Sequence, residues 1–227
     1  MCGRFAQKSP VPSLAKNFDA QLKLESLEPR YNISPTSIVP VVRIPHQETK
    51  RTLEGLKWGL IPSWASDPSI GFKLANARAE TVADKPSFRS AFKKQRCLVP
   101  IDGFFEWKQD TKPKQPFYFF MKDEKPFALA GLWEYWKPKT GNGEPIYSFT
   151  LITTEPNSLL AKVHDRMPVI IDPKDFEEWL DPANQDPAKL TKFLKPYPAS
   201  KMDSYPVSTF VNAVKNQGPA CIEALKA

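Results

Sequence analysis

The residue with the most distinctive chemistry is a cysteine at the second position of the chain. Cys2 directly follows Met1, and its side chain is small enough for Met1 to be removed. Removal leaves an α-amine and a thiol on one residue, a pair that no internal cysteine carries. The amine, with a pKa of about 7.7–8.0, is partly neutral near pH 7 and can attack a carbonyl. The thiol can then close onto the imine as a thiazolidine ring. Position alone does not separate this reaction from a cysteine placed there by chance.

A second candidate is a histidine with charged neighbours. His164, Asp165 and Arg166 are consecutive at an expected junction between a helix and a strand. An adjacent aspartate can hold the imidazole in one tautomer, so that it serves as acid, base or phosphate ligand. The alternative interpretation is a histidine that stabilises the C-terminal end of a helix through the helix dipole.

A third candidate is a carboxylate inside an aromatic strand. In an extended chain Phe104, Glu106 and Lys108 share one face, and Phe105 and Trp107 share the other. A carboxyl group packed against aromatic rings can hold a raised pKa and act as a general acid. The alternative is an edge-strand Glu106 that simply pairs with Lys108.

Two further segments are suited to contact with nucleic acid. In an extended 74–80 segment, Asn76, Arg78 and Glu80 point the same way, and an amide beside a guanidinium suits a phosphate-bearing cleft. The 58–64 segment, which begins and ends with Trp58 and Trp64, predicts a proline-stiffened aromatic tip that can stack on a base.

The remaining cysteines and histidine predict neither a disulfide framework nor a metal site. Cys97 lies in an apolar run and is expected to be a small buried residue, and Cys221 near the C-terminus is interpreted in the same way. The two cysteines are far apart in the sequence. His46 is expected in a solvated loop. No C-x-x-C pair is present. We therefore expect no metal and no cofactor.

The composition favours a globular protein with a polyanionic partner. The chain has 227 residues, 41% of them hydrophobic, and a net charge of +7 with a pI near 9.2. This balance favours nucleic acid, although charge alone also fits a protein that is merely basic. No apolar run approaches the roughly 18 residues of a membrane span, and the N-terminus lacks the apolar core of a secretory signal. We expect a cytoplasmic protein with no membrane partner.

Hydrophobic patterning predicts one α+β domain over residues 1–227, built on a curved antiparallel or mixed β-sheet with peripheral helices. A turn is predicted at Lys137–Gly143. Strands are predicted at Ile38–Ile44, Thr52–Leu60, Cys97–Ile101, Phe104–Lys108, Phe117–Met121, Phe127–Trp133 and Tyr147–Thr153. Helices are predicted at Ser13–Phe18, Lys85–Lys94, Asn157–Val163, Lys174–Leu180 and Ala188–Leu194, the last two capped by Asp172 and Asp186 with proline at the first position.

Taken together, these segments resemble the SOS response-associated peptidase family, whose members are also described as abasic-site processing proteins. The resemblance runs nearly from end to end of the chain. Its motifs are Met1-Cys2-Gly3-Arg4-Phe5, Arg30-Tyr31-Asn32-Ile33-Ser34-Pro35, Trp58-Gly59-Leu60-Ile61-Pro62, Asn76-Ala77-Arg78-Ala79-Glu80-Thr81, Phe105-Glu106-Trp107, His164-Asp165-Arg166-Met167-Pro168 and Val211-Asn212-Ala213-Val214-Lys215-Asn216.

The resemblance implies a fold with a β pseudo-barrel and an enzyme that senses abasic sites in single-stranded DNA. Cys2 would form a thiazolidine crosslink with the ring-opened deoxyribose aldehyde, shielding the lesion during the DNA damage response. Asn76 would orient the amine, Glu106 would act as general acid and base, and His164 would assist ring opening and hold the neighbouring phosphate. The resemblance also implies lyase-like chemistry, a monomer, association with the nucleoid on DNA, and a DNA-binding set of Arg4, Trp64, Arg78, Thr153 and Arg166.

Three other functions remain open at the level of sequence. An N-terminal-nucleophile hydrolase or amidotransferase would use the thiol on an amide and the α-amine as base, but nine glycines in the chain fit its glycine-rich loops poorly. A non-covalent single-strand-binding module would use only charge and aromatic rings. A thiol peptidase would cleave other proteins, although removal of Met1, by the protein itself or by an aminopeptidase, is enough to explain the family name.

Overall fold

A computed structural model describes residues 2–24, 27–110, 112–139 and 143–225. Met1, and with it the predicted removal of that residue, lies outside the described residues. The predicted turn at 137–143 also lies partly outside them. All the predicted strands lie within the described residues.

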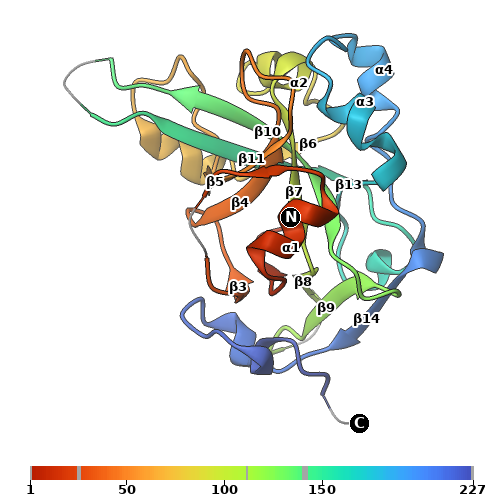
Figure 1. Ribbon diagram of the computed structural model, residues 1–227. Helices are drawn as coiled ribbons and strands as arrows, with labels where there is room; N and C mark the ends of the chain where they lie inside the picture. Colours follow the sequence, from red (N-terminus) through yellow and green to blue (C-terminus); the bar gives the residue numbers. More distant parts are fainter. Residues whose placement is uncertain (1, 25–26, 111, 140–142, 226–227) are drawn as a thin grey trace.

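Five long strands form a barrel (Figure 1). In spatial order they are β11 (Ile146–Thr154), β10 (Phe127–Trp136), β7 (Arg96–Ile101), β4 (Ile38–Arg43) and β5 (Thr52–Trp58). These neighbours are antiparallel, and the ring closes where β5 pairs in parallel with β11, with Trp58 opposite Phe149. The barrel is extended by the short strands β2 (Gln21–Leu22), β6 (Asn76–Arg78), β12 (Met167–Pro168) and β13 (Ile170–Ile171).

A smaller antiparallel sheet packs against the barrel and appears at the bottom of Figure 1. Its order is β14 (Met202–Pro206), β9 (Pro116–Met121), β8 (Gly103–Trp107), β1 (Phe5–Gln7) and β3 (Arg30–Ile33). The predicted α+β class with a pseudo-barrel is confirmed. The seven predicted strands all form, because apolar and β-branched runs of this length bury well in a sheet.

Four short helices cover the outside of the barrel. They are α1 (Val11–Asn17), α2 (Arg89–Lys94), α3 (Phe176–Leu180) and α4 (Pro187–Thr191). Short 3₁₀ turns occur elsewhere along the described chain: η1 (Pro68–Lys73), η2 (Leu160–Lys162), η3 (Pro173–Asp175), η4 (Ala199–Lys201), η5 (Thr209–Asn212) and η6 (Pro219–Cys221). The apolar side chains of the four helices, Leu14, Phe92, Trp179 and Leu190 among them, share a buried cluster with barrel residues such as Leu98. Among the described residues, no helix has both the length and the apolar character needed to cross a membrane.

The helix predictions were right in place and partly wrong in extent. Asp172 and Asp186 cap their segments as predicted, each accepting a hydrogen bond from the backbone two residues on. The expected helix at 157–163 is a turn capped by Asn157, followed only by η2. The expected helix at 85–94 is helical only in α2, and the expected helix at 188–194 stops at Thr191. Proline at the start and one buried face support little more than one turn of helix in these places.

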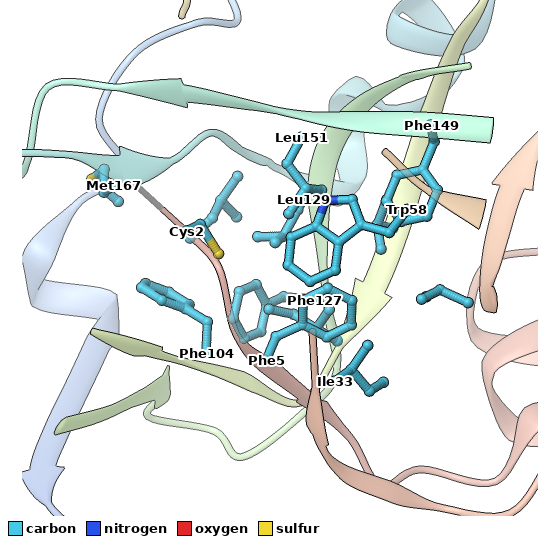
Figure 2. Packing of buried hydrophobic residues seen from close by; sticks show 14 of the residues in the cluster. Cys2, Phe5, Ile33, Trp58, Phe104, Phe127, Leu129, Phe149, Leu151 and Met167 are labelled. Carbon is cyan, nitrogen blue, oxygen red and sulfur yellow. The ribbon is translucent and has the colours of Figure 1, made fainter. Parts of the chain in front are cut away.

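One of the two largest buried clusters lies between the barrel and the smaller sheet. It joins Phe5, Phe104 and Phe119 of the sheet to Trp58 and Leu151 of the barrel. Figure 2 shows Cys2 within this cluster, with its sulfur directed toward the rings at the centre. Cys97 and Cys221 are also buried and His46 is exposed, as predicted.

Candidate active site

Cys2 is separated from β1 only by Gly3 and Arg4, and it is completely buried. Burial raises the pKa of its thiol far above the ordinary value, and the negative charge of Glu106 raises it further. A hydrogen bond from the backbone N–H of Arg4 to the sulfur acts in the opposite direction. The resting sulfur is therefore a neutral thiol in an apolar setting, and the influence of Glu106 on it shows that the two groups are neighbours.

Asn76 opens β6, which lies beside β11 and is positioned by pairing with Leu151. Its side-chain Nδ2 donates a hydrogen bond to the backbone oxygen of Cys2 at 2.9 Å. Its Oδ1 is buried and accepts no hydrogen bond from the described residues. The amide therefore holds the backbone of Cys2 and presents one further acceptor at the same place.

Glu106 lies in β8, the strand that pairs with β1, and its side chain is buried on the face that it shares with Phe104. Burial raises the pKa of Glu106 from 4.5 to about 7. The predicted alternation of this strand is confirmed, because Phe104 joins the cluster of Cys2 while Phe105 and Trp107 lie in a separate cluster on the opposite face. Near neutral pH Glu106 can thus either donate or accept a proton.

His164 follows η2 and lies next to Glu106. Its Nε2 is 3.8 Å from Oε2 of Glu106, while Nδ1 is 3.1 Å from Oδ1 of Asp165 and accepts a hydrogen bond from the backbone N–H of Arg166 at 3.0 Å. Burial lowers the pKa of His164. Burial thus disfavours the charged form of both groups, the carboxylate of Glu106 and the imidazolium of His164.

The guanidinium of Arg166 binds two groups, the carboxylate of Glu80 and the backbone oxygen of Thr153. Both its terminal nitrogens bond to the carboxylate of Glu80, at 2.6 and 2.9 Å, and one also donates to the backbone oxygen of Thr153 at 2.6 Å. The hydrogen bond from Arg166 lowers the pKa of Glu80. Thr153 has a fully buried side chain whose hydroxyl donates to Ala77, so Thr153 reaches the site through its carbonyl rather than its side chain.

Trp64 and Arg78 lie on the surface. The Trp64 side chain is 53% exposed, and Arg78 is exposed at the end of β6. The backbone beneath Trp64 is fixed, because the indole of Trp136 donates to Ala65 at 2.8 Å. Gly59 adopts a φ of +125° where its Cα approaches Gly71 closely, a geometry that only glycine accepts readily.

Trp58, at the start of the predicted aromatic tip, is part of the core. Its side chain is completely buried in the cluster between the sheets, and its indole donates to Ala75 at 2.9 Å. Trp58 thus supports the strand that carries Asn76, while Trp64 alone remains at the surface. The burial of Trp58 follows from its place where the barrel closes, opposite Phe149.

Arg4 does not extend freely into solvent. One terminal nitrogen of its guanidinium donates to Oδ1 of Asn32 at 2.8 Å and to the backbone oxygen of Val211 at 3.0 Å. The guanidinium also lies over the ring of Trp107, 5.6 Å from its centre. Burial lowers its pKa. Arg4 is therefore already engaged with protein groups in this structure.

Two further features were not predicted. Phe72 is 69% exposed at the end of the segment that carries Trp64; its flanking Gly71 and Lys73, typical of a surface loop, were the only signal. A hollow of about 490 Å³ adjoins His164 and is lined in part by Lys108 and Lys162. A larger hollow of about 930 Å³ beside α1 contains none of the predicted site residues. No group of three or more metal-ligating side chains occurs among the described residues.

Comparison with known proteins agrees with the resemblance seen in the sequence. The model of the SOS response associated peptidase (SRAP) family matches residues 1–214. The chain is 44% identical to the abasic site processing protein YoqW of Bacillus subtilis, covering 99% of this chain and all of that one. It is 34% identical to the abasic site processing protein HMCES of Gallus gallus, covering 86% of this chain and 66% of that one. A solved structure from Bacteroides thetaiotaomicron superposes with a TM-score of 0.89 at 29% identity, covering 99% of this chain and all of that one.

Proposed function

The chain belongs to the SOS response-associated peptidase family, and on this premise we propose that it processes abasic sites in single-stranded DNA by covalent attachment through Cys2. The relatives YoqW and HMCES carry the name of abasic site processing proteins. The observation that supports the covalent mechanism best is the convergence of Asn76, Glu106 and His164 on Cys2.

The first step forms an imine between Cys2 and the DNA. After removal of Met1, the neutral α-amine of Cys2 attacks C1′ of the ring-opened deoxyribose aldehyde, and one water leaves. The buried Oδ1 of Asn76 can accept a hydrogen bond from that amine and aim its lone pair, since its Nδ2 already holds the Cys2 carbonyl. Protonated Glu106, with its pKa of about 7, supplies the proton that the departing hydroxyl needs.

The second step closes the ring. The Cys2 sulfur bonds to the imine carbon and the imine nitrogen gains a proton, giving a thiazolidine with no further loss of atoms. Because burial keeps the Cys2 thiol protonated, its proton needs an acceptor, and the carboxylate of Glu106 lies close enough to influence it. Holding the amine, the thiol and the aldehyde together supplies much of the acceleration, since effective molarities can reach about 10⁵–10⁸ M.

The DNA is proposed to lie across the exposed residues around this site. Trp64, and Phe72 further along the same segment, offer aromatic faces for stacking, and Arg78 offers a charge for phosphate. His164 borders the hollow that Lys108 and Lys162 line, which suits a second phosphate. Binding in this way would depend strongly on salt and little on sequence.

The remaining proposals follow from the same chemistry. A peptidase activity is needed only to remove Met1, either by the protein itself or by an aminopeptidase. The thiazolidine would shield the lesion from strand cleavage. The protein is proposed to act as a single-domain cytoplasmic monomer that associates with the nucleoid when bound to DNA.

A denaturing gel tests the proposal. The protein is incubated with a labelled single strand that carries one abasic site, and with the matched strand without one. We expect a denaturant-resistant shifted band only with the abasic strand, and no band with Cys2→Ala. A band of equal strength with Cys2→Ala would refute attachment through Cys2, and Cys2-dependent release of ammonia from glutamine without a band would favour the amidotransferase.

A further inference from the structure

Two sequence motifs have no role in the mechanism above, and the structure brings them together. Asn32 comes from the first, at residues 30–35, and Val211, Ala213 and Asn216 from the second, at residues 211–216. Asn32 is 1% exposed, and its Nδ2 lies within 3.0–3.1 Å of the backbone oxygens of these three residues. A single buried amide thus binds one chain segment at three points.

That segment is the C-terminal strap, which we define as residues 207–225. It covers the outer face of the smaller sheet, where Val207, Val211 and Cys221 pack against Phe105 and Tyr118. Gln217 fastens the strap along β3. Its Oε1 accepts from the backbone N–H groups of residues 31 and 32, and its Nε2 donates to the oxygen of residue 32, at 3.0–3.2 Å. The side chain of Gln217 therefore satisfies the open edge of the sheet as a neighbouring strand would.

Arg4 links the strap to the active site. Its guanidinium binds Oδ1 of Asn32 and the oxygen of Val211. Its backbone N–H bonds to the Cys2 sulfur, and its backbone oxygen accepts from Phe105, the residue before Glu106, at 2.9 Å. One residue thereby contacts the strap, the nucleophile and the strand of the general acid.

We propose that Asn32 positions Cys2 by acting through Arg4. In this way Asn32 couples the geometry of the Cys2 thiol to docking of the C-terminal strap. The expected effect of Asn32 on crosslinking rests on the proposed function. Its effect on the thiol does not depend on DNA. Loss of the Asn32 amide frees one side of the Arg4 guanidinium, so the backbone between Cys2 and Phe5 gains mobility.

The test compares three variants of the full chain lacking Met1. Asn32→Ala removes the bonds to both the strap and Arg4. Gln217→Ala removes only the bonds that hold the strap along β3. Tyr205→Phe is the matched control. Tyr205 also fastens the strap, but at a different place, through its hydroxyl to the oxygen of Ile222 at 2.7 Å, whereas Gln217 bonds the backbone of Asn32 itself. Cys2 alkylation by iodoacetamide without DNA is followed by peptide mass spectrometry, with buried Cys97 as the internal reference.

We expect Asn32→Ala to raise Cys2 alkylation about tenfold and Gln217→Ala to raise it about threefold, with Cys97 and the Tyr205→Phe control unchanged. Asn32→Asp keeps an oxygen for Arg4 but loses the donor to the strap, so its Cys2 alkylation should lie between that of the parent and that of Asn32→Ala. At saturating abasic DNA the crosslinking rate of Asn32→Ala should fall about tenfold, while affinity for an undamaged strand stays within about twofold.

Equal alkylation of Asn32→Ala and the parent protein would overturn the proposal, as would parallel labelling of Cys2 and Cys97, which indicates general loosening. If Asn32→Ala does not fold, Gln217→Ala decides: labelling no faster than that of Tyr205→Phe contradicts the proposal. If the parent protein forms no crosslink, the proposed function fails, and the alkylation measurements still decide whether Asn32 positions Cys2.

Discussion

The surroundings of Cys2 and the segment that carries Trp64 and Phe72 are built in opposite ways. Cys2 and Glu106 are 0% and 3% exposed between two sheets, and hydrogen bonds to the backbone oxygens of Cys2 and Arg4 fix the chain that follows the thiol. Trp64 and Phe72 are 53% and 69% exposed, above an anchored backbone. The first region has its geometry without any ligand, whereas under the proposed function the second would gain its partners only when DNA binds. Substitutions in the first should therefore alter rate, and substitutions in the second should alter binding.

The largest effect should come from separating the two nucleophiles of Cys2. Cys2→Ser retains the α-amine after Met1 removal but has no thiol to close the ring, so an imine forms and reverses. We expect no stable adduct on a denaturing gel, and recovery of an adduct when borohydride reduces the imine. If borohydride traps no adduct with Cys2→Ser, the α-amine does not take part in the mechanism.

Glu106→Gln should have the next largest effect on rate. A general acid contributes about 10²- to 10⁴-fold, so crosslinking at pH 7 should slow at least about 100-fold while affinity for undamaged DNA is retained. Two protonation states set the crosslinking rate of the parent: the α-amine must be neutral, with a pKa near 8, and Glu106 must be protonated, with a pKa near 7. The product of these two requirements gives a bell-shaped dependence of the rate on pH. Glu106→Gln should lack the falling limb, and a rate profile unchanged by the substitution would remove Glu106 from the chemistry.

The same substitution should have a measurable effect on stability. The folded pKa of Glu106 is about 7 against 4.5 in the unfolded chain, so the folded state binds the extra proton. The free energy of unfolding therefore falls as pH rises from 4.5 through 7 and stays lower above that. Glu106→Gln escapes this loss and should be more stable than the parent at pH 8, by up to about 3 kcal/mol in urea unfolding. Equal or lower stability of the variant at pH 8 would contradict the raised pKa.

Trp64→Ala should weaken binding and leave the fold intact. Stacking on one base contributes about 1–3 kcal/mol, so the Kd for a single strand should rise about tenfold in fluorescence anisotropy. The crosslinking rate at saturating DNA should change little, because Trp64 lies outside the buried groups around Cys2. Trp58→Ala is the contrasting variant: it empties a core position, so the free energy of unfolding should drop by about 3–5 kcal/mol. An unchanged Kd for Trp64→Ala would deny stacking a role.

Arg78→Ala should have the smallest effect. Loss of one exposed phosphate contact should weaken binding a few-fold and reduce the slope of log K against log salt by about 1. Arg89→Ala, at the start of α2 on the helical side of the barrel, serves as a charge-matched control. An identical salt slope in Arg78→Ala and the parent would exclude a phosphate contact at this position.

The sequence predicted the long strands and the identities of the candidate residues better than it predicted their partners. Apolar runs predicted strands β4 and β5 and strands β7 to β11. The short strands β1, β3 and β14 were not predicted, because they form only through pairing with strands that are distant in the sequence. The structure brings Cys2, Asn76, Glu106 and His164 together. It was not predictable that Trp58 is core, that Glu80 holds Arg166, or that Asn32 holds the C-terminal strap. Each depends on which segments meet in space, and residue type does not specify that.

Intact mass spectrometry tests the central claim most directly. The purified chain is measured before and after mixing with a single strand that carries one abasic site. We predict a protein lighter by Met1 and an adduct whose mass is that of this protein plus the DNA strand minus one water. Protein that retains Met1 should remain unmodified in the same spectrum. An adduct on the Met1-retaining form, or none on the processed form, would contradict attachment through the aminothiol of Cys2.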